Sequence, residues 1–472
     1  MLMDRYAASN LFAVVPTLER EFDPQLRELD RLLDDDVLFQ AVKADLGRRS
    51  PHTASRGRPS TPVEVILRML VTKRLYGWSY EQTEYFVADS LVLRQFCRVY
   101  LQPVPDDTTL LRWAKLIGPT TLQQLNHRVV TLAASLRVTR GRKLRVDSTV
   151  VETNIHHPTD SRLVGDGVRV VSRLLRRAKT VVGETTELGK DAFRTRMRTI
   201  RRLTQQLHRV ARRKGEEAAE DLKQAYEKLI HVADATRRQA RRVRDGLQAH
   251  ATRKAQQLGE QMDHFLPLLD QAIDQATRRV LHGEVVPAKE KLLSLFEPHT
   301  QVIQRHKAGK AVEFGRKVLL DEVDGGIISR YDLLADGGLD HPHLPASLDA
   351  HQQRFGHPPD ILAGDRGFFT PENEDRARAA GVNQIVLPKT GRVSQERQRY
   401  EKQPWFRRGF RFRAGIEGRI SVLRRCYGLD CCLDHGLDGM ERWVGWGILT
   451  HNLTKIAYTR VNQLPRRLPI AA

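Results

Sequence analysis

The sequence has 472 residues, of which 40% are hydrophobic and 29% charged, and this balance predicts a globular chain. Its length suggests about two to four domains. The formal net charge of +21 predicts attraction to polyanions, and nucleic acid is the partner that we expect, although a generic solvated basic surface would carry the same charge. No stretch approaches the length of uninterrupted apolar residues that a transmembrane helix requires, which disfavours a membrane protein.

Neither a signal peptide nor a cysteine-based metal site is expected. The start of the chain lacks a basic segment followed by an apolar one, so we expect a cytoplasmic protein. The cysteines do not have the paired Cys-x2-Cys spacing of a zinc site, and we expect them to be reduced and mostly buried in the core. They are Cys97, Cys426, Cys431 and Cys432.

Residues 1–60 are expected to form a helical or irregular segment that ends in a basic linker. Helical periodicity over residues 24–42 predicts one helix. Residues 47–59 are rich in Arg, Ser, Gly and Pro, which is typical of a domain boundary.

Residues 61–135 are expected to form a helical domain. A helix should begin at Thr61-Pro62, and Ser79 followed by Gln82 predicts a capping box. Two short helices are expected around residues 81–87 and 91–100, and Asp107 should cap a further helix. Short helices joined by tight turns are typical of helix-turn-helix modules. They are equally typical of any small bundle, so DNA contact and core packing both remain possible.

The segment that contains Asp147 has the composition of a strand. Apolar residues recur over residues 142–153, and the polar run Asp147-Ser148-Thr149 interrupts their alternation. An acidic side chain at the end of an apolar strand is costly to bury unless a positive group compensates it. The alternative interpretation is an Asp that caps a turn.

A polar loop and a long helical insertion follow this strand. His156 and His157 lie in the loop, where adjacent histidines are more often solvated than bound to metal. Residues 167–299 show helical periodicity and two Arg-dense runs, at 194–214 and 237–244, with almost no acidic residues inside them. Such helices are either self-solvating or form an arm that lies along phosphates.

The C-terminal part alternates strands and helices. Gly325-Gly326 predicts a hairpin between strands at 312–320 and 327–334, and a short strand ends at Asp365. Helices are expected at 345–355, from Thr370, at 410–423 and at 440–458, with a further strand at 382–389 and a polar, basic loop over 390–409. Glu417 lies one turn after Arg413, so an ordinary surface ion pair is the simplest interpretation of it.

Three carboxylates can nevertheless converge in such a fold. Neighbouring strands can bring Asp147 and Asp365 together at their ends, and a helix packed on the sheet can supply Glu417. Three hard oxygen ligands suit Mg²⁺ or Mn²⁺. Two such ions, about 3.5–4 Å apart, would clamp the attacking and leaving oxygens of phosphodiester chemistry.

The order and spacing of these motifs resemble those of the DDE-type transposases of bacterial insertion sequences, in the branch with an N-terminal helical domain. The resemblance rests on Val146-Asp147-Ser148-Thr149, on Gly364-Asp365-Arg366-Gly367, and on Phe410-x2-Arg413-x3-Glu417-x6-Arg424. In the last motif Phe410 replaces a tyrosine of the family and Arg424 replaces a lysine.

The resemblance implies an α/β fold in which an RNase H-like mixed sheet flanked by helices is interrupted by a long helical insertion. An all-α N-terminal domain would precede it. The catalytic domain would comprise residues 136–166 and 300–460, the insertion residues 167–299, and a C-terminal tail residues 461–472.

The resemblance also implies an enzyme that binds the terminal inverted repeats of its element, cleaves the DNA strands and joins them to target DNA. Asp147, Asp365 and Glu417 would hold two Mg²⁺ or Mn²⁺ ions. Pairing two ends implies a homodimer in the synaptic complex, and the location would be the bacterial cytoplasm, at the nucleoid. The residues implied to contact DNA are Arg413, Arg424, Arg366 and Lys389. A nuclease without strand transfer and an inactive DNA-binding relative remain alternatives.

Overall fold

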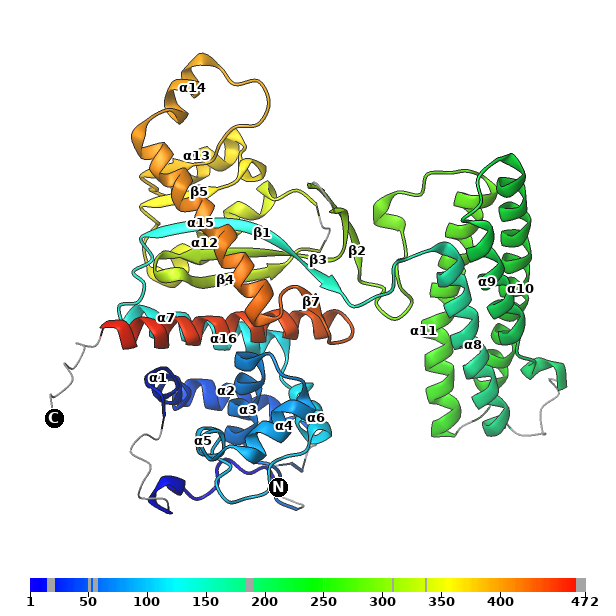
Figure 1. Ribbon diagram of the computed structural model, residues 1–472, viewed down its shortest axis with the longest axis horizontal. Coiled ribbons are helices and arrows are strands. Elements are labelled where there is room, and N and C mark those ends of the chain that lie inside the picture. Colours follow the sequence, from blue (N-terminus) through cyan, green and yellow to red (C-terminus); the bar gives the residue numbers. More distant parts are fainter. Residues whose placement is uncertain are drawn as a thin grey trace. The chain divides into compact units, whose positions relative to one another are not determined.

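The computed structural model describes residues 1–14, 22–49, 52–53, 58–182, 190–248, 250, 252–307, 310–335 and 338–463. Parts of the expected linker (50–51 and 54–57) and of the expected tail (464–472) therefore lie outside the described residues. The chain is mixed α/β, as predicted, and divides into two compact units (Figure 1). The first unit comprises Met1–Glu152 and Arg316–Ala472, and the second comprises Thr153–Gly315.

The N-terminal region is helical, as predicted, and within its described residues no strand precedes β1. Its elements are the 3-10 helix η1 (Leu11–Val14) and the helices α1 (Pro24–Leu33), α2 (Asp36–Gly47), α3 (Val63–Tyr76), α4 (Tyr80–Asp89), α5 (Leu91–Phe96), α6 (Asp107–Ala114) and α7 (Pro119–Ser135).

Local capping decides where several of these helices begin. The single helix expected over 24–42 is wrong, because Asp35 accepts the Leu38 N–H (3.1 Å) and starts α2 separately from α1. The cap of α6 is Asp106 rather than Asp107, since its carboxylate accepts the Thr109 N–H (2.8 Å). The capping box of Ser79 and Gln82 is confirmed.

The helix expected over 91–100 ends early, because Arg98 and Tyr100 adopt positive φ angles of 57° and 53°. The pair α3 and α4 has the short connection of a helix-turn-helix, through Gly77 at φ 68°. Helix α3 is buried on almost all sides, whereas α4 exposes Tyr85 and Phe86. Core packing is therefore the role of α3.

The strands form one mixed sheet. They are β1 (Lys143–Thr153), β2 (Gln301–Lys307), β3 (Lys310–Val323), β4 (Ile327–Leu333), β5 (Ile361–Gly364), β6 (Gln384–Val386) and β7 (Cys431–Cys432). Their order is β2-β3-β1-β5-β6, with β4 paired to β3 and β7 paired to β1. The pairs β2–β3 and β3–β4 are antiparallel, whereas β1–β5 and β5–β6 are parallel.

Two features of the sheet bear on the sequence interpretation. The turn between β3 and β4 is at Gly325-Gly326, as predicted, with φ angles of 81° and 77°. Strand β1 continues through Asp147-Ser148-Thr149, so these residues do not form the turn that we considered as the alternative.

The helices that accompany the sheet in the first unit are α12 (Leu344–Phe355), α13 (Pro371–Ala379), α14 (Gln395–Glu401), α15 (Pro404–Tyr427) and α16 (Leu437–Gln463), with the 3-10 helices η6 (Asp324–Gly326), η7 (His341–His343) and η8 (Arg366–Phe368). The loop expected over 390–409 is wrong. Ser394 caps α14 by accepting the Arg397 N–H (3.2 Å), and Pro404 opens α15.

Helix α16 joins the helical region to the sheet. The Asn452 side chain accepts the Ile328 N–H of β4 (2.9 Å) and donates to the side-chain oxygen of Asn126 on α7 (2.8 Å). All three residues are fully or almost fully buried, so these polar groups are satisfied inside the core.

The second unit is mainly helical, as the periodicity over 167–299 predicted, and has its own core, but it extends beyond those bounds to Thr153–Gly315 and includes β2. Its helices are α8 (Asp160–Val182), α9 (Met197–Val210), α10 (Glu216–Gln248) and α11 (Arg253–Ala276), with shorter turns η3 (Lys190–Phe193), η4 (Thr277–Leu281) and η5 (Ala288–Glu290). The core includes Val171, Leu203, Leu229 and Met262, one from each long helix, all at most 5% exposed.

The second of the two Arg-dense runs is neutralised inside this unit. Arg241 of α10 lies 2.7 Å from Asp270, and Arg244 lies 2.6 Å from Asp263, with both carboxylates on α11. The run 237–244 therefore contributes to helix pairing, although its own sequence contains hardly any acidic residues.

A buried arginine fixes α3 in the first unit. Arg68 is fully buried and donates to Asp30 (2.8 Å), Asp34 (2.5 Å) and Glu64 (3.2 Å). It also donates to the carbonyl of Phe96 (3.1 Å). A guanidinium can be buried at tolerable cost only when its donors are satisfied in this way.

We expect Arg68→Met to lower the free energy of unfolding by about 3 kcal/mol, because the carboxylates would lose the fully buried member of the two arginines that they share, Arg68 and Arg98. Chemical denaturation of the full chain measures this. The control is Arg31→Ala, whose side chain is 65% exposed in its pair with Glu28 and should cost less than about 1 kcal/mol. Equal losses in both variants would contradict the prediction.

Candidate active site

The register of the parallel pair β1–β5 places two predicted carboxylates side by side. The last paired residues are Val146 and Gly364, so Asp147 and Asp365 are the next residues on the two strands. Gly364 has no room for a side chain, since a Cβ there would lie 2.8 Å from Leu387. The register therefore brings Asp147, which lies within β1 and not at its end, beside Asp365, which follows the end of β5.

Burial makes both carboxylates costly to ionise. Asp147 is only 8% exposed, and burial raises its pKa to about 6. The Arg413 guanidinium opposes this increase, whereas the neighbouring carboxylates of Asp365 and Asp340 add to it. Burial also raises the pKa of Asp365, against the effect of the Gly367 N–H, which donates to its carboxylate (2.8 Å). The site therefore has a local excess of negative charge.

A buried ion cluster positions α15 over this part of the sheet. Glu322 of β3 has a fully buried side chain, and Arg145 of β1 donates to both of its oxygens (2.9 and 2.7 Å). Arg419 of α15 donates to the same carboxylate (3.1 Å). Arg145 also donates to the carbonyl of Phe412 (2.5 Å). At Gly415 a Cβ would lie 2.4 Å from Arg145, so glycine permits this approach.

Arg413 connects the two remaining parts of the predicted site. Its Nη2 lies 3.1 Å from Asp147 Oδ2, and its Nη1 lies 2.9 Å from Glu417 Oε1. The Glu417 side chain is 68% exposed. Glu417 thus makes the i−4 ion pair that was the simplest interpretation, and it reaches Asp147 only through Arg413. Within the described ranges, no three acidic, histidine or cysteine side chains are grouped closely enough to hold a metal ion.

The other predicted DNA-contacting residues lie outside this cluster of contacts. Arg424 donates to Asp430 through Nε (2.9 Å) and Nη2 (2.6 Å). Arg366 is exposed in η8, directly after Asp365. Lys389 is half-buried, and its backbone N–H donates to Glu401 (3.0 Å).

Asp340 is an acidic neighbour that the sequence analysis missed. It raises the pKa of both Asp147 and Asp365, and it lies 2.9 Å from Lys317 Nζ of β3. It precedes η7 in an irregular segment, so no strand pattern or motif spacing connects it with the other carboxylates. Only its position in the folded chain brings it to the site.

The histidine and cysteine candidates are not gathered with other ligands. His157 packs edge-on against Phe314, with ring centroids 5.7 Å apart. All four cysteines are free thiols, and the prediction that they fill the core is confirmed for the two buried ones, Cys97 and Cys432.

The donor set of the carboxylate pair fits divalent cations in part. Asp147, within β1, and Asp365, directly after β5, are neighbouring hard oxygen donors, and their raised pKa values indicate that positive charge would stabilise their ionised forms. Glu417, the third expected ligand, is paired with Arg413 instead. The arrangement can therefore attract a cation through the aspartates, while Arg413 occupies the position between Asp147 and Glu417.

In EDTA, we expect Asp147→Asn to stabilise the protein near neutral pH by on the order of 2 kcal/mol. The folded state binds a proton at Asp147 up to a pH of about 6, so the ionised carboxylate costs stability above that pH. Below about pH 4 the wild-type side chain is also neutral, and the difference in melting temperature should vanish. Glu417→Gln, at an exposed position, should change the melting temperature little at either pH. Destabilisation by Asp147→Asn at neutral pH alone would contradict the prediction.

Comparison with known proteins identifies a family for the N-terminal region. Residues 16–116 match the family model "Transposase domain (DUF772)". A protein of Rhizobium meliloti named for ORF8 in the nfe locus is 30% identical over 129 residues, which is 26% of this chain. This chain spans 61% of the length of that relative. No solved structure matches the chain significantly.

Within the described residues, no helix combines the length and the apolarity needed to cross a membrane. The match of residues 16–116 to a transposase-domain model agrees with the resemblance of the chain to insertion-sequence transposases.

Proposed function

We propose that this chain is a DDE-type DNA transposase that binds the terminal inverted repeats of an insertion sequence and cleaves and transfers DNA strands. The observation that carries the proposal is the register of β1 and β5, which places Asp147 beside Asp365. Arg413 of α15 contacts the carboxylate of Asp147. The match of residues 16–116 to a transposase domain supports DNA as the substrate.

The sheet supports an RNase H-like catalytic core. The pair β1–β5 is parallel, the pair β3–β4 is antiparallel, and the acidic residues follow or lie within adjacent strands. Active-site residues commonly gather at the carboxyl ends of neighbouring parallel strands, where their side chains share one edge of the sheet.

Asp147 and Asp365 would hold divalent cations, and Glu417 is the candidate for a third ligand. When bound, Mg²⁺ or Mn²⁺ would supply Lewis-acid stabilisation of the attacking and leaving oxygens. In the hydrolytic step, water attacks the phosphorus atom and the 3′ oxygen leaves with a proton as a free hydroxyl. In strand transfer, that 3′-hydroxyl attacks a phosphodiester of target DNA and displaces another 3′ oxygen.

Arg413 is the candidate for positioning the reacting phosphate. Its Nε is buried and, in the part of the chain that is described, has no hydrogen-bond partner. An unsatisfied buried donor costs free energy, which an acceptor such as a phosphate oxygen would recover. Binding of a phosphate by Arg413 would also weaken its hold on Glu417, which would free that carboxylate for the site.

The remaining basic residues would hold the flanking DNA. Arg366 directly follows Asp365 and is exposed. Lys389 follows β6, and Arg424 lies on α15. These are the same positions that the resemblance implies. Since a transposase must hold two element ends, we expect a homodimer in the synaptic complex.

A DNA-binding relative without catalysis is the second candidate. It is favoured by the position of Glu417, which contacts Arg413 and not the aspartates. A nuclease without strand transfer would differ only in its products.

We expect Asp365→Asn to keep binding to the element's ends and to lose cleavage by at least about a hundredfold, since a metal ligand loses its charge. The assay uses a duplex carrying the ends that flank this gene, with Mg²⁺ or with EDTA. Asp360→Asn is the matched control, because Asp360 lies just before β5, is 46% exposed and pairs with Arg142. Cleavage by Asp365→Asn in Mg²⁺ would refute the metal role, and cleavage without joining would favour the nuclease.

We expect Arg413→Ala to reduce strand transfer by roughly tenfold to a hundredfold, because a charge-assisted contact to phosphate is worth about 1.5–3 kcal/mol. Pre-steady-state assays at saturating DNA should show the loss in the rate of the chemical step. Arg411→Ala, a nearby exposed arginine on the same helix, is the control. A normal rate in Arg413→Ala would exclude the positioning role.

A further inference from the structure

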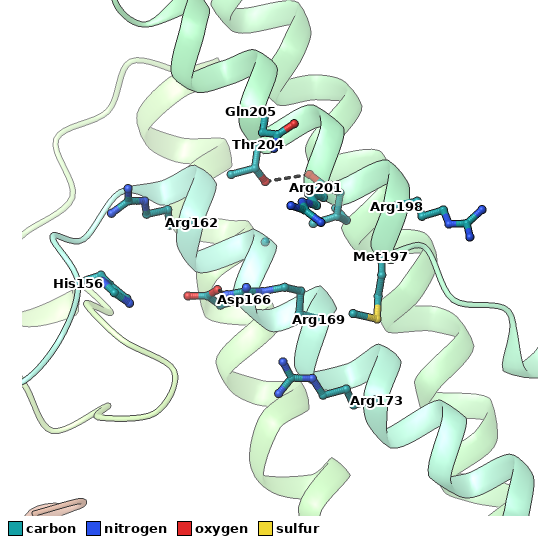
Figure 2. A pocket seen from close by; sticks show the side chains of 12 residues that line it. His156, Arg162, Asp166, Arg169, Arg173, Met197, Arg198, Arg201, Thr204 and Gln205 are labelled. Carbon is teal, nitrogen blue, oxygen red and sulfur yellow. Dashed lines mark hydrogen bonds and ion pairs between the residues drawn. The ribbon is translucent and has the colours of Figure 1, made fainter.

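The second unit contains an arginine-lined groove between α8 and α9. Figure 2 shows the groove, which has a volume of about 720 Å³. It lies entirely within the helical insertion, and all its arginines are exposed. The arginines that line it are Arg162, Arg169 and Arg173 from α8, and Arg198 and Arg201 from α9.

Helical spacing places these arginines in two rows. On α8 they are separated by seven and four residues, and on α9 by three, so each row occupies one helix face. Val164, Val168 and Val171, on the other face of α8, are fully buried in the core of the unit. The arginine rows therefore form the outer face of helices whose inner face is fixed by packing.

Gly165 sets the floor of the groove. It is buried, and a Cβ there would lie 3.1 Å from Thr204 Oγ1 and 3.7 Å from Ile200 Cγ2. Thr204 directs its hydroxyl to the Ile200 carbonyl (2.9 Å), as Figure 2 shows. The absence of a side chain at Gly165 lets α9 approach α8 closely, which brings the two rows near each other.

The charge of this groove is mostly uncompensated. Arg169 pairs with Asp166, which also lines the groove. For the other four arginines, the described part of the chain provides no carboxylate within ion-pair distance. This differs from the run on α10, where Arg241 and Arg244 are paired with α11. Guanidinium groups gathered on one surface without carboxylate partners repel one another, so an anionic partner would be strongly attracted.

We propose that this groove binds the phosphate backbone of duplex DNA, as a second DNA-contacting surface separate from the Asp147–Asp365 pair. Guanidinium groups donate in a planar fork that matches phosphate oxygens. The lining contains no Phe, Tyr or Trp on which unpaired bases could stack, so the contact would be to the backbone and independent of sequence. The identification of DNA as the ligand rests on the proposed function, whereas the description of the groove is independent of that function.

The test is DNA binding by the full chain in EDTA, which separates binding from cleavage. The groove variant is R162A/R173A/R198A/R201A. The control, R177A/R202A/R212A/R242A, removes the same number of exposed arginines from the same unit, outside the groove. Fluorescence anisotropy with a labelled duplex of arbitrary sequence gives Kd at a series of salt concentrations from low to moderate. Circular dichroism verifies that each variant is folded.

We expect the groove variant to reduce the slope of log affinity against log salt by about four, roughly one for each lost phosphate contact. The control should reduce it by less than about one. Equal effects of the two variants would overturn the proposal, because they would show only a response to total charge. An unchanged slope in the groove variant would also overturn it and would favour an acidic protein segment as the occupant.

These outcomes are independent of catalysis. If Asp365→Asn still cleaved, or if no cleavage occurred at all, the proposed function would fail while a selective loss of DNA binding in the groove variant would still support this inference. Conversely, normal binding by the groove variant would leave the assignment of Asp147 and Asp365 untouched.

Discussion

The candidate site depends on the ion pairs that the buried carboxylate of Glu322 forms with two arginines. This carboxylate accepts from Arg145 of β1 and Arg419 of α15, while Glu322 is itself part of β3. Removing Glu322 would leave two largely buried guanidinium groups without the carboxylate that they share, which is far more costly than the loss of a surface pair. The cluster therefore fixes the position of α15 along the sheet. Arg413 and Glu417 lie on that helix at the level of Asp147 because of this constraint.

Arginine has several different roles in this chain, and its surroundings decide which one applies. Arg68 is buried and satisfied by three carboxylates, so it is structural. Arg241 is paired across two helices. Arg162 and Arg201 line a groove with little acidic compensation. The positive charge of the chain is therefore compensated unevenly, and its unpaired positions are where a polyanion would gain most.

In the site formed by the carboxylate pair and Arg413, the charged groups shift the pKa values of the two aspartates. Asp365 and Asp340 raise the pKa of Asp147, and Asp340 raises that of Asp365, whereas Arg413 lowers both and Lys317 lowers that of Asp365. In such an arrangement, Asp147 can exchange its contact with Arg413 for a bound cation, and Arg413 can exchange the same contact for a phosphate. Concentrated, buried charge of this kind is more typical of functional sites than of structural ones.

The sequence by itself determined the helical N-terminal region, the helical insertion, the Gly325-Gly326 turn, the strand that contains Asp147 and the strand that precedes Asp365, because periodicity and turn residues are local signals. It did not determine the break at Asp35 or helix α14, where a single capping hydrogen bond outweighs the pattern. Tertiary structure alone decided that Asp340 joins the carboxylates, that Arg413 contacts Asp147, and that one arginine run is neutralised while another contributes to a groove. Each of these depends on contacts between residues distant in sequence, for which local pattern carries no signal.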